Sequence, residues 1–113
     1  MDKIEKYKNI IQEEFDYQKT IKIANAPDIK RHLIVNKDRT DFLLLDIGFQ
    51  GKSYSHYPVF HVAIEKGQVI IYQDNTDIAL VNILMDAGIE KSDIVLGYLA
   101  KLSQKYSPYA VAA

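Results

Sequence analysis

The sequence predicts an α+β fold with an N-terminal helix, a four-stranded antiparallel meander sheet, and one or two helices at its C-terminal end. Three observations lead to this prediction. Apolar residues recur at steps of three and four up to residue 20, alternate with polar ones through most of residues 32–73, and return to a helical spacing from residue 77. At 113 residues, with 48% hydrophobic and 26% charged residues, the chain suits one domain spanning residues 1–113.

The first helix is expected over residues 2–20. The stripe predicted to be buried consists of Ile4, Tyr7, Ile11, Phe15 and Gln18. Lysines and glutamates fill the positions between them, which is typical of an amphipathic helix with one buried face. Asp2 is expected to cap the first turn, and Pro27 disfavours helical geometry at the residue before it, so the helix ends before that point.

Four strands are expected at residues 32–36, 41–49, 57–65 and 69–73, because short polar turns join them in a pattern that favours an antiparallel meander. Pro58 cannot donate a hydrogen bond to a neighbouring strand. It therefore marks a bulge or the start of the third strand, and regular pairing is expected from Val59 onward. The GFQG segment at residues 48–51 is expected to form the turn between the second and third strands, with its glycines in backbone angles that other residues disfavour.

The C-terminal third returns to helical character. Residues 77–87 predict an apolar helix, with Asp74, Asn75 and Thr76 able to cap its start and Gly88 placed to end it. Residues 90–102 predict a second helix that begins at Ser92. The tail, residues 106–113, is apolar and aromatic, and we expect it to dock against the rest of the protein, because disordered ends are usually polar.

The composition indicates the cellular compartment in which the protein works. It has no cysteine, which excludes disulfides and thiolate chemistry. Its first residues are charged throughout and do not resemble a signal peptide, and no apolar run reaches the ~18–20 residues needed to span a membrane. We therefore expect a cytoplasmic protein with no membrane contact.

No group of residues predicts a catalytic, metal or cofactor site. The nearest candidate is His61 with Glu65 on the same strand face, which makes a small hydrolase the last-ranked of three hypotheses. No serine lies in a G-x-S-x-G elbow, and the glycines of GFQG lack both phosphate-binding spacings. We expect the protein to be no enzyme and to need no cofactor.

Tyrosine is the most informative residue type, because eight occur and no tryptophan does. Tyrosine combines a large apolar face with a polar tip and is enriched at protein interfaces. The predicted partner-binding residues lie beside the GFQG turn and in the tail; they are Phe49, Gln50, Tyr54, Tyr57, Tyr106 and Tyr109. These residues, with the apolar tail, favour a protein that binds partners and forms a homo-oligomer.

Direct DNA binding is the alternative function. The formal net charge is −1 and only two cationic residues are arginines, which weighs against base readout. A local patch near the first hairpin still offers cations for phosphate contact: Lys30, Arg31, Lys37 and Arg39. In this reading the protein is a recombination directionality factor that touches DNA through these four residues.

Several of these segments together resemble the XisI family, the fdxN element excision controlling factors of cyanobacteria. They are MDKIEKYKNIIQ, GFQGKSY, HVAIEKGQVIIYQDNT, GIEKSDIVLGY and YAVA, in the order and spacing of that family and over nearly the whole chain. The sequence departs from the family pattern at Phe49, Asn75 and Glu90, where Trp, Gly and Pro are usual, and near Lys105, where Arg is common.

The resemblance implies a small α+β protein that assists a site-specific recombinase together with an XisH-like partner encoded beside it. It does not imply catalysis, since the recombinase would break and rejoin the DNA. The leading prediction is therefore a non-catalytic controlling factor for DNA excision that acts through protein–protein contacts with an XisH-like protein, a recombinase, or both.

Overall fold

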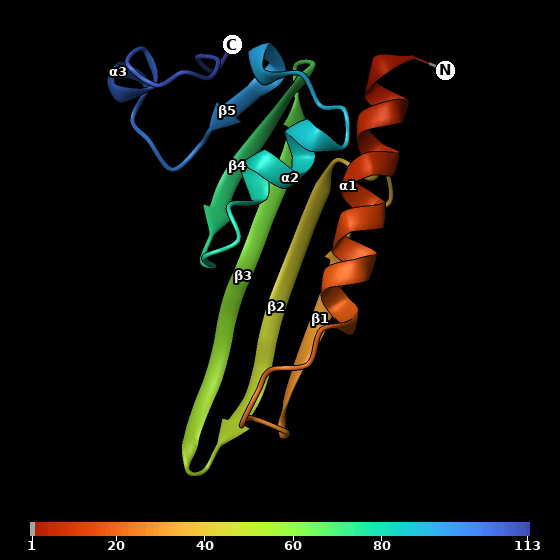
Figure 1. Ribbon diagram of the computed structural model, residues 1–113, viewed down its shortest axis with the longest axis vertical. Coiled ribbons are helices and arrows are strands. Elements are labelled where there is room, and N and C mark those ends of the chain that lie inside the picture. The colour runs from red at the N-terminus through yellow and green to blue at the C-terminus, as the bar shows by residue number, and fades with distance from the viewer. Residues whose placement is uncertain (1) are drawn as a thin grey trace.

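A computed structural model describes residues 2–113 and shows one twisted sheet with α1 and α2 on the same face (Figure 1). The elements are α1 (Lys3–Thr20), β1 (Ile29–Val35), β2 (Asp41–Gln50), β3 (Ser53–Glu65), β4 (Gln68–Asp74), α2 (Leu80–Asp86), the 3₁₀ turn η1 (Lys91–Asp93), β5 (Ile94–Leu96) and α3 (Lys101–Gln104). Strands β1 to β4 form the predicted antiparallel meander, and β5 adds a fifth strand parallel to β4. The predicted α+β class is confirmed.

Helix α1 begins and packs as its sequence predicts. The Asp2 carboxylate accepts a 2.8 Å hydrogen bond from the Glu5 N–H, so the expected cap is present. The buried residues of the helix are Tyr7, Ile11, Phe15 and Gln18. Phe15 meets the rings of Phe42 on β2 and Phe60 on β3, with centroids 5.8 and 5.9 Å apart. These contacts attach the helix to the centre of the sheet.

The strands are longer than predicted. β1 begins at Ile29 rather than residue 32, and β3 begins at Ser53, so the expectation of regular pairing only from Val59 is wrong. The bulge expected at Pro58 is confirmed, and its extra residue is Val59, because Leu44 pairs with residue 60 while Leu45 pairs with residue 58. One extra residue in β3 lets the chain pass its proline without losing the ladder on either side.

The turn between β2 and β3 lies later than predicted. Pairing continues to Gln50 and Ser53, so Gly51 and Lys52 form the turn and Gly48 lies inside β2. Both glycines have positive φ, 147° and 63°, as expected. Residues 48–57 form a hairpin arm that projects beyond the end of α1 (Figure 1).

The expected helix over residues 90–102 is wrong. The segment forms η1, β5 and the start of α3 instead, because Ile94 and Val95 are fully buried at the edge of the sheet beside β4. Two adjacent β-branched residues favour a strand at such a place. The chain then leaves the sheet at Gly97, where a Cβ would lie 2.6 Å from Cγ2 of Ile70.

The other C-terminal features agree better with the sequence. α2 begins at Leu80, three residues later than predicted, and its first N–H group donates a 2.8 Å hydrogen bond to the Asp74 carboxylate. Gly88 follows the helix with φ 120°. The tail docks as expected, since Ala110 bridges to Val95 and the side chain of Gln68 bonds to residues 111 and 113 at 3.0 and 2.9 Å.

Candidate functional site

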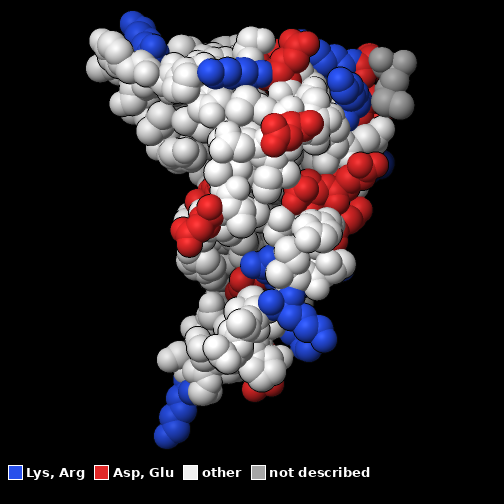
Figure 2. Space-filling view, viewed as in Figure 1, with Lys and Arg blue, Asp and Glu red and all other residues white. Residues whose placement is uncertain are grey.

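The hairpin arm carries an exposed aromatic pair. Phe49 and Tyr54 are partners across β2 and β3, with ring centroids 5.2 Å apart and ring planes tilted by 57°. Their exposed fractions are 51% and 60%. Figure 2 shows the opposite, helix-bearing face, where lysine or arginine side chains lie at the lower tip and on the lower right of the molecule. Such a pair offers rigid, apolar contact area to another protein.

The other two predicted arm residues point elsewhere. Gln50 pairs with Ser53 beside the tip and is exposed. Tyr57 pairs with Asp46. Its side chain lies on the opposite face of the arm from that of Tyr54, because the two residues are three positions apart in the strand. The arm therefore presents aromatic side chains on both of its faces.

The tail residues lie at the opposite end of the molecule from the arm (Figure 1). Tyr106 is 86% exposed, whereas Tyr109 is partly buried against the hydrophobic core and has Lys91 Nζ 5.7 Å from its ring centroid. The structure thus divides the predicted partner-binding residues between two separate places. The contacts of Tyr109 hold the tail, while Tyr106 is displayed to solvent.

Both arginines of the predicted DNA patch form hydrogen bonds with other residues of the chain. Arg31 Nε donates to Asp46 Oδ1 at 3.0 Å, and Arg31 Nη1 donates to the carbonyl of Gln18 at 3.1 Å. Arg39 Nη2 donates to the side chains of Glu5 and Asn9 at 3.2 and 3.0 Å. Exposed cations remain at Lys30 and Lys37, which lie near opposite ends of β1. At ~3.3 Å per residue, about 20 Å separates them along the strand.

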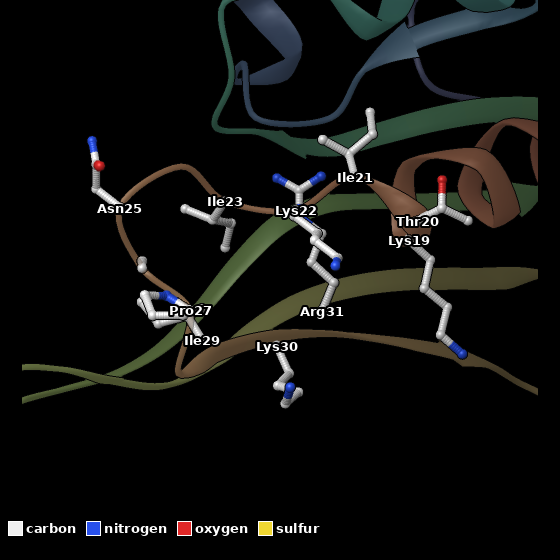
Figure 3. A pocket seen from close by; sticks show the side chains of 11 residues that line it. Lys19, Thr20, Ile21, Lys22, Ile23, Asn25, Pro27, Ile29, Lys30 and Arg31 are labelled. Carbon is white, nitrogen blue, oxygen red and sulfur yellow. The ribbon is translucent and has the colours of Figure 1, made fainter.

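A groove of about 450 Å³ lies between the segment that follows α1 and the start of β1 (Figure 3). Its lining residues are Lys19, Thr20, Ile21, Lys22, Ile23, Asn25, Ala26, Pro27, Ile29, Lys30 and Arg31, with no acidic residue among them. Lys30 projects to the other side of β1 from Arg31. Lys19 and Lys22 were missed by the sequence reasoning, because no local pattern links a helix end to a strand that starts several residues later.

The candidate pair His61 and Glu65 is separated by a tyrosine. His61 Nε2 lies 3.2 Å from Asp41 Oδ1 and its ring centroid lies 5.2 Å from that of Tyr72. The Tyr72 hydroxyl donates to the Glu65 carboxylate, and this hydrogen bond, with partial burial, raises the pKa of Tyr72. Glu65 therefore accepts a hydrogen bond from the Tyr72 hydroxyl and does not orient the imidazole of His61.

Residues 2–113 also bear on metal binding and on membrane crossing. No three histidine or carboxylate side chains of this stretch gather closely enough to hold a metal ion. Within the same residues, no helix combines the length and the apolar character that crossing a membrane requires.

Known proteins resemble this chain along nearly its whole length. The family described as XisI protein matches residues 1–111. The crystal structure of a XisI-like protein from Anabaena variabilis ATCC 29413 superimposes with a TM-score of 0.89 at 26% identity, covering 97% of this chain and 100% of that one. The fdxN element excision controlling factor XisI from the same organism gives a TM-score of 0.79 at 27% identity, covering 98% and 100%. No curated protein matches the chain.

Proposed function

This chain belongs to the XisI family, and we propose that it is a non-catalytic accessory factor that controls a site-specific DNA excision of the fdxN element type. One observation carries the proposal: a structure described as an fdxN element excision controlling factor matches 98% of the chain with a TM-score of 0.79. Neither solved relative is described as an enzyme. The separation of His61 from Glu65 by Tyr72 supports a role without catalysis.

The proposed factor acts through protein contacts, with an XisH-like protein as its partner and a recombinase as a further one. We assign the partner contact to the hairpin arm, because it projects from the sheet and exposes Phe49 and Tyr54. Large exposed aromatic side chains are the groups that most often anchor protein interfaces. The factor is expected to work in the cytoplasm and as a homo-oligomer.

An excision assay tests this function. In a host that carries the element, the gene for this chain is deleted and the excised junction is quantified by amplification across it. We expect the junction to disappear, and to return when the wild-type chain is supplied. A Phe49→Ala/Tyr54→Ala variant should restore much less of it, whereas Tyr17→Ala, which alters an exposed tyrosine on α1, should restore all of it. Unchanged excision without the chain would contradict the proposal.

DNA binding is the second candidate function. The observation that favours it is the groove, whose lining includes Lys19 and Lys22 and no acidic residue, with Lys30 close by on the other side of β1. Electrostatic contact with phosphates needs several such cations and weakens steeply with salt. A gel-shift titration at rising salt tests it with a Lys19→Ala/Lys22→Ala/Lys30→Ala variant, which alters exposed side chains and leaves the Arg31 ion pair in place. A steep salt slope that this variant flattens establishes the function; no shift at low salt removes it.

A further inference from the structure

Neither α1 nor α2 covers the other face of the sheet, which on β1 to β3 carries six apolar and five polar or charged side chains; two of the apolar ones, Leu45 and Ala63, are already buried. Because strand residues alternate between faces, residues that flank the core positions Phe42 and Leu44 point away from the helices. On β1, β2 and β3 this open face consists of Lys30, His32, Ile34, Asp41, Leu43, Leu45, Ile47, His56, Pro58, His61 and Ala63. The bulge at Val59 brings His56 and His61 onto this same face. Ile34 is 52% exposed there, and Leu43 and Ile47 are partly exposed.

The open face is large enough to serve as a contact surface for another protein. Three strands ~4.8 Å apart and seven residues long give about 300–400 Å² in projection, before Tyr72 on β4 is added. This area includes polar as well as apolar side chains. The exposed apolar ones on β1 and β2 are Ile34, Leu43 and Ile47, and clustered apolar exposure of this kind marks contact surfaces on soluble proteins. The tail docks beside β5 and Gln68, at the far edge of the sheet from β1, so it leaves this surface accessible.

We propose that the open face is the contact between two copies of this chain, packed sheet on sheet with their strands antiparallel. The proposal rests on the proposed action through protein contacts and names the surface and geometry of the homo-oligomer. Aligned sheets pack ~10 Å apart, and a two-fold contact requires a surface that is complementary to itself. The order of residues along β2 meets that requirement.

The apolar centre of the face is self-complementary. Consider a two-fold axis that lies midway between the two sheets, perpendicular to the strands, at the level of Leu44. Rotation about this axis reverses the direction of every strand and places each strand over the same strand of the second copy. Leu43 then lies over Leu45 of the second copy, and Leu45 over the second Leu43. On β1 the same operation places Ile34 over His32 of the second copy, since these residues pair with Leu43 and Leu45 respectively. The row that contains Ile34 and Leu43 is therefore buried against the row that contains His32 and Leu45.

The charges at the ends of the face match in the same arrangement. Asp41 and Ile47 lie three residues on either side of Leu44, so each Asp41 comes over Ile47 of the other copy. Ile47 is flanked by Lys30 on β1 and by His56 on β3. The carboxylate of Asp41, whose side chain is 55% exposed and lies 3.2 Å from His61 Nε2 of its own chain, thus approaches Lys30 of the second copy, and this happens twice in one dimer. A parallel arrangement would instead place Asp41 over Asp41.

Light scattering of the purified chain across a range of concentrations tests the proposal. We expect a dimer that Leu43→Glu weakens at least about 100-fold, because it buries a carboxylate at the apolar centre. Leu102→Glu is the matched control, since Leu102 is an exposed leucine on α3 outside the open face, and it should leave the dimer unchanged. Circular dichroism checks that each variant is folded.

A charge exchange tests the geometry with substitutions at exposed positions that do not threaten folding. Asp41→Lys and Lys30→Asp should each weaken the dimer about tenfold, and the double variant should return its dissociation constant to within about threefold of wild type. A chain that stays monomeric, a dimer indifferent to Leu43→Glu, or a double variant that is not rescued would each overturn the proposal. If Leu43→Glu abolishes binding of an XisH-like protein to a monomeric chain, the face belongs to that partner instead. Because these measurements use the chain alone, their failure leaves the excision assay as an independent test of function.

Discussion

Arg31 and Asp46 form an ion pair between β1 and β2, with Arg31 Nε 3.0 Å from Asp46 Oδ1 and each side chain only 13% exposed. The same guanidinium donates to the carbonyl of Gln18 in the last turns of α1. One arginine thus joins the end of the helix to the base of the hairpin arm. A residue that the sequence assigns to DNA contact has a structural role in the fold.

Arg31→Ala should therefore lower stability. Removing one member of a largely buried pair leaves the Asp46 carboxylate without its counter-charge, and we expect a loss of about 3 kcal/mol in the free energy of unfolding. Lys30→Ala, on the neighbouring exposed position, should change it by less than about 0.5 kcal/mol. Urea unfolding of the two variants measures the difference. Equal stabilities would show that the ion pair contributes nothing to the fold.

Gly48 should be irreplaceable in a way that Gly51 is not. A Cβ at Gly48 would lie 2.1 Å from the carbonyl oxygen of Asp28, and its φ of 147° disfavours any side chain. We expect Gly48→Ala to cost about 3 kcal/mol or more, or to prevent folding. Gly51 has open space around it and φ 63°, so Gly51→Ala should cost only about 1 kcal/mol. Thermal unfolding compares the two, and similar losses would contradict the close approach at Gly48.

Asp93 should make stability depend on acid pH. Burial acts to raise the pKa of Asp93, but hydrogen bonds from Tyr7 at 2.6 Å and Lys3 at 2.9 Å outweigh it, so the pKa lies below its usual value of 3.8. A carboxyl whose folded-state pKa is lowered stabilises the protein above its unfolded pKa and loses that contribution as the pH falls through the folded value.

The expected result is a pH-dependent difference between wild type and Asp93→Asn. The difference in free energy of unfolding should be constant above about pH 5 and should shrink below about pH 4. Asp86→Asn, at an exposed position on α2, serves as the control and should show little difference at any pH. Urea unfolding from pH 2.5 to 7 gives both curves. A difference that grows on acidification would contradict the interaction.

Deleting residues 106–113 should weaken folding or association. The deletion removes the bridge between Ala110 and Val95, the bonds of Gln68 to the tail, and the hydrogen bond from the residue 112 N–H to Gln104 Oε1. It also uncovers the fully buried Val95. Tyr106→Ala should leave stability unchanged, because that side chain is displayed to solvent. A truncated protein with the same mass in solution, stability and partner binding would show that the tail has no such role.

The sequence specifies the parts of the fold that local patterns control. The stripe of α1, its Asp2 cap, the period of two through β2 to β4 and the Pro58 bulge are all visible in the order of residues. β5 was missed because its three residues, Ile94–Leu96, are too few to show a period and lie within a segment of helical character. Only its position beside β4 decides its conformation.

The site was harder to predict, because it depends on which distant residues meet. The pairing of Arg31 with Asp46 follows from the register of β1 on β2, which the sequence does not state. His56 and His61 share a face only because the bulge adds one residue between them. The exposure of the arm aromatics was foreseen from their place beside glycines, but the length of the arm was not.

Binding of the purified chain to an XisH-like protein, measured by isothermal titration calorimetry, tests the central claim most directly. Action through protein contacts at the hairpin arm predicts saturable binding of the wild-type chain, weakened at least tenfold by Phe49→Ala/Tyr54→Ala and unaffected by Tyr17→Ala. Absence of binding by the folded wild-type chain would contradict the claim. Equal affinity of the Phe49→Ala/Tyr54→Ala variant and the Tyr17→Ala control would contradict it as well.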